Sequence, residues 1–140
     1  MENRFQGILK IAEVNETDAA QGYVKAKEVW EFNQSKLNEL RAFRAEYHQE
    51  AETVSYRPQQ FQSTRNFLSQ LSVAIDSQEA EVARTLSRLG NEESQWLASR
   101  VKRKSIETLS AKRDAEYEAK RDKLEQFEID EMSRRDRPKF

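Results

Sequence analysis

Hydrophobic and polar positions along this chain form two long ladders in which steps of three and four residues alternate. A mean spacing of about 3.5 residues keeps one seam of a helix facing a neighbouring helix and imposes a left-handed supercoil. The ladders therefore predict two long coiled-coil helices. The first consists of Phe5, Leu9, Ala12, Glu16, Ala19, Tyr23, Ala26, Trp30, Asn33, Leu37, Leu40, Arg44 and Tyr47. The second consists of Leu68, Leu71, Ile75, Gln78, Val82, Thr85, Leu89, Glu92, Trp96, Ser99, Arg103, Ile106, Ser110, Arg113, Tyr117, Lys120, Leu124 and Phe127.

A proline-marked break separates the two ladders. Pro58 lacks a backbone donor and keeps Arg57 out of the helical region, so either Ser63 caps the second helix or Pro58 lies in its first turn. We expect helix one at about residues 3–52, a connection at about 53–63 and helix two at about 63–135, within one domain over residues 1–140. A connection of roughly ten residues suits antiparallel neighbours. The predicted fold is all-α, a long antiparallel two-helix coiled coil (an α-hairpin) whose second helix is the longer.

The unequal lengths leave the end of the second helix without a partner in the hairpin. If the turn centres near residue 57, Phe5 lies near Leu109, and residues after about 111 face nothing. Their seam positions still include Tyr117, Leu124 and Phe127. An unpaired apolar stripe is typical of a docking surface. We expect this segment to fray in isolation and to dock in a complex.

Polar residues interrupt both seams. Buried polar seam residues fix the register of a coiled coil at a cost in stability, so we expect a hairpin of modest stability. These residues are Glu16, Asn33, Arg44, Gln78, Glu92 and Arg103.

The composition suits a narrow seam better than a broad core. The hydrophobic fraction is 36% and the charged fraction 35%, which is polar for a globular domain. Three glycines and two prolines disfavour a turn-rich β architecture. The absence of cysteine excludes disulfides and thiolate chemistry, and no apolar run approaches the ~18 residues of a membrane span. With no cleavage signal at residues 1–9, we expect a cytosolic, uncleaved chain.

The charges are unevenly spread although the net charge is −1. The basic residues of the second helix form either a solvated face or a docking surface for an acidic partner. A nucleic-acid binder using the same residues is the less favoured reading, because the net charge provides no long-range attraction. This basic belt comprises Arg100, Lys102, Arg103, Lys104, Lys112 and Arg113.

Few residues suggest chemistry. His48 is the only histidine, and a metal site would need it together with carboxylates such as Glu46, Glu50 and Glu52. General acid–base catalysis needs paired groups in a water-excluded cleft, and two packed helices provide none. We expect no catalytic residues, no metal, no cofactor and no small-molecule substrate.

Aromatic residues beside the seam are more informative. Phe43 and Phe67 each precede a seam residue, and Ala74 continues that flank on the second helix. They either widen the seam or form an exposed patch, since large rigid side chains dominate the binding energy of protein interfaces. The neighbouring seam residues are Leu40, Tyr47, Leu71 and Gln78.

Several segments, taken in order, resemble one family. Residues 37–47 read LNELRAFRAEY and residues 66–78 read NFLSQLSVAIDSQ. Trp96 is followed by a basic run, and residues 125–135 read EQFEIDEMSRR, with an acidic pair before the end. Over nearly its whole length the chain resembles the FliJ proteins of the bacterial flagellar type III export apparatus.

This resemblance implies a non-enzymatic antiparallel coiled coil similar to the central stalk of rotary ATPases, monomeric in isolation. In the family the stalk binds the export ATPase FliI, the cytoplasmic domain of the export gate FlhA, and export chaperones, at the cytoplasmic side of the inner membrane. The implied gate-binding residues are Leu40, Phe43, Tyr47, Phe67, Leu71, Ala74 and Gln78. Phe43 stands where the family often has tyrosine, and Gln78 stands where the family can have histidine. The implied ATPase contacts are Leu124, Phe127, Asp130 and Glu131.

Two alternative hypotheses about function share the predicted fold. One is the equivalent stalk of a virulence type III secretion system, which differs only in its partners. The other is a generic scaffold or chaperone that oligomerises through its seams.

Overall fold

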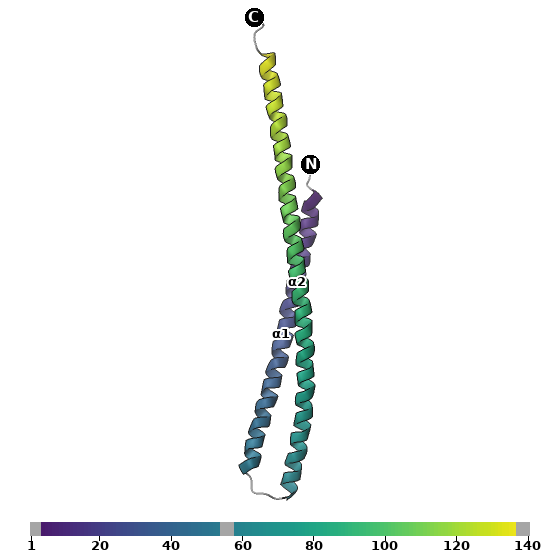
Figure 1. The fold of residues 1–140 in the computed structure, drawn as a ribbon, viewed down its shortest axis with the longest axis vertical. Helices are drawn as coiled ribbons and strands as arrows, with labels where there is room; N and C mark the ends of the chain where they lie inside the picture. The colour runs from purple at the N-terminus through teal and green to yellow at the C-terminus, as the bar shows by residue number, and fades with distance from the viewer. Residues whose placement is uncertain (1–3, 54–57, 137–140) are drawn as a thin grey trace. The chain divides into compact units, whose positions relative to one another are not determined.

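The computed structural model describes residues 4–53 and 58–136, and two helices account for nearly all of them (Figure 1). Helix α1 comprises Arg4–Thr53 and helix α2 comprises Pro58–Arg135, with 50 and 78 residues respectively. No strand occurs among the described residues, and the two helices pack against each other. The prediction of an all-α pair of helices with a longer second helix is confirmed.

Helix α2 begins earlier than the break in the pattern indicates. Pro58 is its first residue, so of the two predicted starts the structure adopts the one with proline in the first turn. A proline is tolerated there because the first backbone N–H groups of a helix have no partner within it. The predicted start at Ser63 is wrong. Residues 54–57 of the predicted connection, Arg57 among them, lie outside the described residues. The single-domain assignment stays a prediction.

The chain divides into two compact units, which are described separately. The hairpin unit comprises Asp18–Trp96, and the terminal unit comprises Met1–Thr17 together with Leu97–Phe140.

The core of the hairpin unit lies on the predicted seam. Leu37, Leu71 and Ile75 are its buried centre, and Ile75 is only 1% exposed. Half-buried Leu40, Phe67 and Val82 pack around this centre. Ala26 and Thr85 are also buried, the hydroxyl of Thr85 donating to the carbonyl of Val82. A core this narrow draws almost all its members from one stripe per helix, as the heptad spacing requires.

Aromatic side chains fill the seam where the core residues of α1 are small. Tyr23 stacks on Trp96, with ring centroids 5.3 Å apart and an interplanar angle of 17°. Trp30 is half-buried, and its ring N–H has no hydrogen-bond partner among the described residues. An unpaired buried donor costs roughly 1–3 kcal/mol, so the burial of Trp30 stabilises the fold by less than its apolar area alone would suggest.

The terminal unit has fewer buried residues than the hairpin unit. Ala12, Ile106 and Ser110 are its buried residues. From residue 111 to residue 130 every side chain is exposed, although the heptad phase continues. Within this unit the end of α2 extends past the start of α1 (Figure 1). Residues 111–135 are called the tail from here on.

The tail remains helical to Arg135, and the backbone N–H of Asp136 donates to the carbonyl of Met132 just past the last turn. Fraying was expected here, and the structure differs. The tail consists largely of Ala, Glu, Lys, Arg and Leu, which have high intrinsic helix propensity. These residues favour the helix even where their side chains are exposed.

Burial along both helices confirms the predicted seam. Every ladder residue from Phe5 to Tyr47 and from Leu68 to Ser110 is buried or half-buried. Every ladder residue from Arg113 to Phe127 is exposed. Burial of the ladder thus ends close to residue 111, where the helix lengths predict that the paired seam ends.

Two glycines within the helices differ in what surrounds them. A Cβ added at Gly22 would lie 2.7 Å from a carboxylate oxygen of Glu92, whereas one added at Gly90 would meet nothing within 4 Å. Neither glycine has a positive φ. Gly22 therefore leaves room for the carboxylate of Glu92, and Gly90 has no such role.

Replacing Gly90 with alanine should stabilise the protein. We expect Gly90→Ala to raise the free energy of unfolding by about 1 kcal/mol, the difference in helix propensity between the two residues. Gly22→Ala should gain less, because the Glu92 side chain has to move. Urea unfolding followed by circular dichroism measures both, and a lower midpoint for Gly90→Ala than for the parent protein would contradict this account.

Candidate functional site

Three aromatic rings from both helices gather in the hairpin unit. Phe43 and Tyr47 are one turn apart on α1, and their ring centroids are 6.5 Å apart. Phe67 of α2 meets Phe43 edge-on at 6.0 Å and lies 4.5 Å from Tyr47. These three residues are called the aromatic cluster. Such offset and edge-to-face arrangements are the favoured geometries for ring pairs.

The aromatic cluster is anchored on one side and open on the other. Phe67 packs against the hydrophobic core and is half-buried, as is Tyr47. Phe43 is 48% exposed. The cluster thus holds an exposed phenylalanine in a defined position, because its two neighbours are themselves held by the seam. It both widens the seam and presents an apolar surface.

The other residues of the implied gate-binding set occupy different environments. Leu71 is 7% exposed and belongs to the core, and Leu40 packs against it. Ala74 is exposed. The structure therefore brings Phe43, Tyr47 and Phe67 together, while Leu71 can affect a partner only by supporting its neighbours. Whether this set binds the gate stays a prediction.

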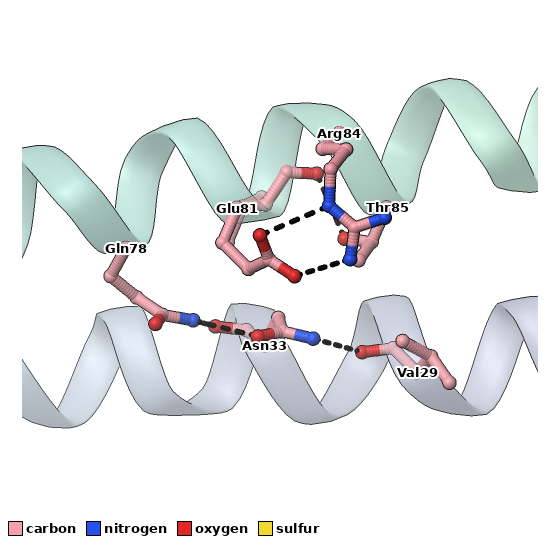
Figure 2. Close-up of polar contacts among 7 residues, drawn as sticks. Val29, Asn33, Gln78, Glu81, Arg84 and Thr85 are labelled. Carbon is pink, nitrogen blue, oxygen red and sulfur yellow. Dashed lines mark hydrogen bonds and ion pairs between the residues drawn. The ribbon is translucent and has the colours of Figure 1, made fainter.

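Gln78, the last member of that set, is engaged within the seam. Its side-chain amide donates to the backbone carbonyl and to the side-chain oxygen of Asn33, both at 3.0 Å (Figure 2). Asn33 in turn donates to the carbonyl of Val29 at 2.8 Å. The two polar residues satisfy each other, so they favour one alignment of α1 against α2.

Arg103 forms the corresponding polar layer of the terminal unit. It donates to Glu16 across the seam and to Glu107 one turn along α2. Only 22% of the Arg103 side chain and 20% of the Glu16 side chain are exposed. The hydrogen bond from Arg103 to Glu16, followed by that to Glu107, raises the pKa of Arg103. The guanidinium therefore stays charged and ties the two helices together.

The remaining ion pairs lie at the surface. Arg84 and Glu81 pair along α2 (Figure 2), and their hydrogen bond lowers the pKa of Glu81. Arg41 of α1 lies 3.0 Å from Glu79 of α2, with both side chains 46% exposed. In the basic belt, Arg113 lies 3.9 Å from Glu116. Exposed pairs of this kind contribute little to stability.

The sequence pattern missed one aromatic residue. Phe61 on α2 is 52% exposed and lies one heptad before Leu68. The predicted break extends to residue 63 and so leaves Phe61 out of the second ladder. Continuing the ladder backwards by seven residues would have found it.

The described residues offer little for chemistry. Within residues 4–53 and 58–136 no group of three His, Cys, Asp or Glu side chains could hold a metal ion, and His48 is exposed. Neither α1 nor α2, as described, is apolar enough over a long enough stretch to cross a membrane.

The implied ATPase contacts all lie on the tail. Leu124 is 64% exposed and Phe127 65% exposed. Asp130 is exposed and accepts a hydrogen bond from Gln126, and Glu131 is half-buried. These residues follow one another along α2, and their binding role stays a prediction.

Two long helices joined by a narrow seam, with a partly exposed aromatic cluster and an exposed helical tail, define a coiled-coil protein suited to contacts with other proteins. The family model described as Flagellar FliJ protein matches residues 1–136. The chain belongs to this family and is a component of the flagellar type III export apparatus. No curated protein and no solved structure matches the chain.

The Arg103 layer provides a test of how register is held. Glu16→Ala should lower the urea midpoint, because Arg103 then loses its partner across the seam. Replacing both residues with leucine should recover most of the loss, since the seam becomes continuous and apolar.

Glu81→Ala is the control for this test, because its partner Arg84 lies on the same helix, and it should leave the midpoint unchanged. Equal losses for Glu16→Ala and the double leucine variant would show that the pair is not what couples the helices.

Proposed function

We propose that this protein is the central-stalk-like component of the export apparatus, binding the export ATPase ring through its tail and the export gate through its aromatic cluster. The observation that carries the proposal is the change in burial at Ser110. The ladder continues with the same spacing beyond Ser110, but its side chains from Arg113 to Phe127 are exposed. A seam that stays in phase while Lys120, Leu124 and Phe127 are exposed favours a partner from outside the chain.

The tail suits the ATPase because it is a pre-formed helix with accessible large side chains. Leu124 and Phe127 lie three residues apart on one face, and the acidic pair Asp130 and Glu131 follows. Since the tail is already helical, a partner does not bear the cost of ordering it. Helix-in-groove binding uses apolar anchors at this spacing.

The aromatic cluster suits the gate for a different reason. Phe43 is exposed but positioned by Tyr47 and Phe67, so little side-chain freedom is lost when it is covered. Interface energy is concentrated in such rigid aromatic anchors. Leu40 and Leu71 lie beneath as support.

Under this proposal the chain itself hydrolyses nothing. It binds differently to different states of the ATPase ring and so biases their populations, and a second contact to the gate couples the two. It works at the cytoplasmic side of the flagellar base, where it also assists the cycling of export chaperones.

The gate contact is tested by Phe43→Ala. We expect unchanged helicity, because Phe43 is half exposed and outside the buried core. Binding of the purified cytoplasmic domain of the gate should weaken by about tenfold or more, as for an interface anchor. Isothermal titration calorimetry measures the affinity.

Phe32→Ala is the matched control for the gate contact. Phe32 is also on α1 and is 61% exposed, but it lies outside the aromatic cluster. Its replacement should leave gate affinity unchanged. Equal affinities for the parent protein and Phe43→Ala would remove the gate from the proposal.

The ATPase contact is tested by ending the chain at Ala111. The buried seam ends at Ser110, so the shortened chain should keep the unfolding midpoint of the full chain. It should fail to stimulate hydrolysis when titrated into the purified export ATPase. The double variant Leu124→Ala and Phe127→Ala, which retains the helix, should show the same failure. Full stimulation by the shortened chain would refute the tail assignment.

A further inference from the structure

The tail carries charges on both flanks of its uncovered seam. Continuing the heptad from Ser110, the seam passes through Lys120, Leu124, Phe127 and Glu131. Arg121 and Glu128 then occupy one flank, and Lys123 and Asp130 occupy the other, all four exposed. Within the described part of the chain, Arg121, Lys123 and Glu128 form no ion pair. Flanking charges of this kind select partner and orientation in coiled coils.

We propose that the tails of two copies of this chain pair with each other as an antiparallel two-helix coiled coil. In the register that the charges favour, Leu124 of one copy packs against Phe127 of the second. Two-fold symmetry repeats this contact, so four apolar side chains form the centre. Lys120 of each copy faces Glu131 of the other, which puts opposite charges at both ends of the centre.

The flanking charges select this register over its neighbour. Here Arg121 lies beside Glu128 of the second copy, and Lys123 lies beside Asp130, so both flanks are attractive. Shifting the second tail by one heptad would place Arg121 opposite Arg121 and Lys123 opposite Lys123. Like charges at these positions destabilise a pair of helices.

The seam charges select the antiparallel orientation. A parallel pair in register would place Lys120 opposite Lys120 and Glu131 opposite Glu131 within the seam itself. Bringing like charges together while removing water is unfavourable. Reversing one helix converts both layers into pairs of opposite charge.

The intramolecular seam confines the contact to the tail. Ile106 and Ser110 are buried within the terminal unit, so a second copy gains access only beyond Ser110. The apolar centre is small and the charge pairs are exposed, so the association is weak and sensitive to salt. A monomer in dilute solution and a dimer in concentrated solution follow from this.

The contact goes beyond the proposed function and does not depend on it. It uses the same stripe as the ATPase contact, so a paired tail and a ring-bound tail exclude each other. Self-association is measured with this protein alone. Its failure would therefore leave the ATPase proposal untouched.

The test is sedimentation equilibrium of the full chain over a range of concentrations, with two charge reversals. The parent protein should approach the dimer mass as concentration rises. Arg121→Glu alone and Glu128→Arg alone should each raise the dissociation constant by at least about tenfold, since each reverses two symmetry-related contacts. An equimolar mixture of the two variants should associate about as tightly as the parent protein, because every such contact then pairs glutamate with arginine.

Glu125→Arg is the matched control, since residue 125 lies on the face away from the seam; its dimer should be unchanged. Circular dichroism checks that each variant keeps its helicity. A monomer at all concentrations would overturn the proposal, as would a dimer indifferent to both reversals. A mixture that fails to associate would point to parallel pairing, in which Arg121 neighbours Glu116 and Glu128 neighbours Lys123, and would also overturn it.

Discussion

The uninterrupted alternation of three- and four-residue steps is the constraint on which the rest of this structure depends. A single inserted or deleted residue would rotate the following side chains away from the seam. Although 35% of the residues are charged, the buried apolar side chains among the described residues all lie on this seam. The seam therefore provides nearly all the burial that opposes the conformational entropy of two long helices. Ile75 and Leu37, the least exposed apolar residues of the hairpin unit, both lie on it.

A seam of leucine and alanine alone would tolerate sliding by one heptad, and the polar layers make that costly. Gln78 reaches both oxygens of Asn33, and Arg103 reaches Glu16. A slipped register would leave these half-buried groups without their partners on the other helix. The polar layers thus lower the stability of the seam but favour a single alignment of the two helices. This matters for the site, because the aromatic cluster combines rings from both helices and exists only in the correct register.

The uncovered tail follows from the same spacing combined with unequal helix lengths. Its seam is in phase with the covered part but carries more charge, including Lys120 and Glu131. The charged residues keep this seam stable in water, and the apolar side chains of Leu124 and Phe127 can be covered by a partner. Under the two proposals, the export ATPase and a second copy of the chain use the same surface, so self-association would keep the tail from the ATPase.

Residue spacing alone determined the two helices, the seam residues up to Ser110 and the exposed stripe beyond it. Heptad periodicity is a property of each helix by itself, so it can be recognised without knowing which helix packs against it. Only the tertiary structure decided that α2 begins at Pro58, that the flanking Phe67 is half-buried while the flanking Phe43 is exposed, and that Phe61 joins the exposed aromatics. Flank residues one position from a seam are covered or open according to the side chains that the other helix places beside them. That pairing depends on register and on ring packing across the interface, which no pattern within one helix contains.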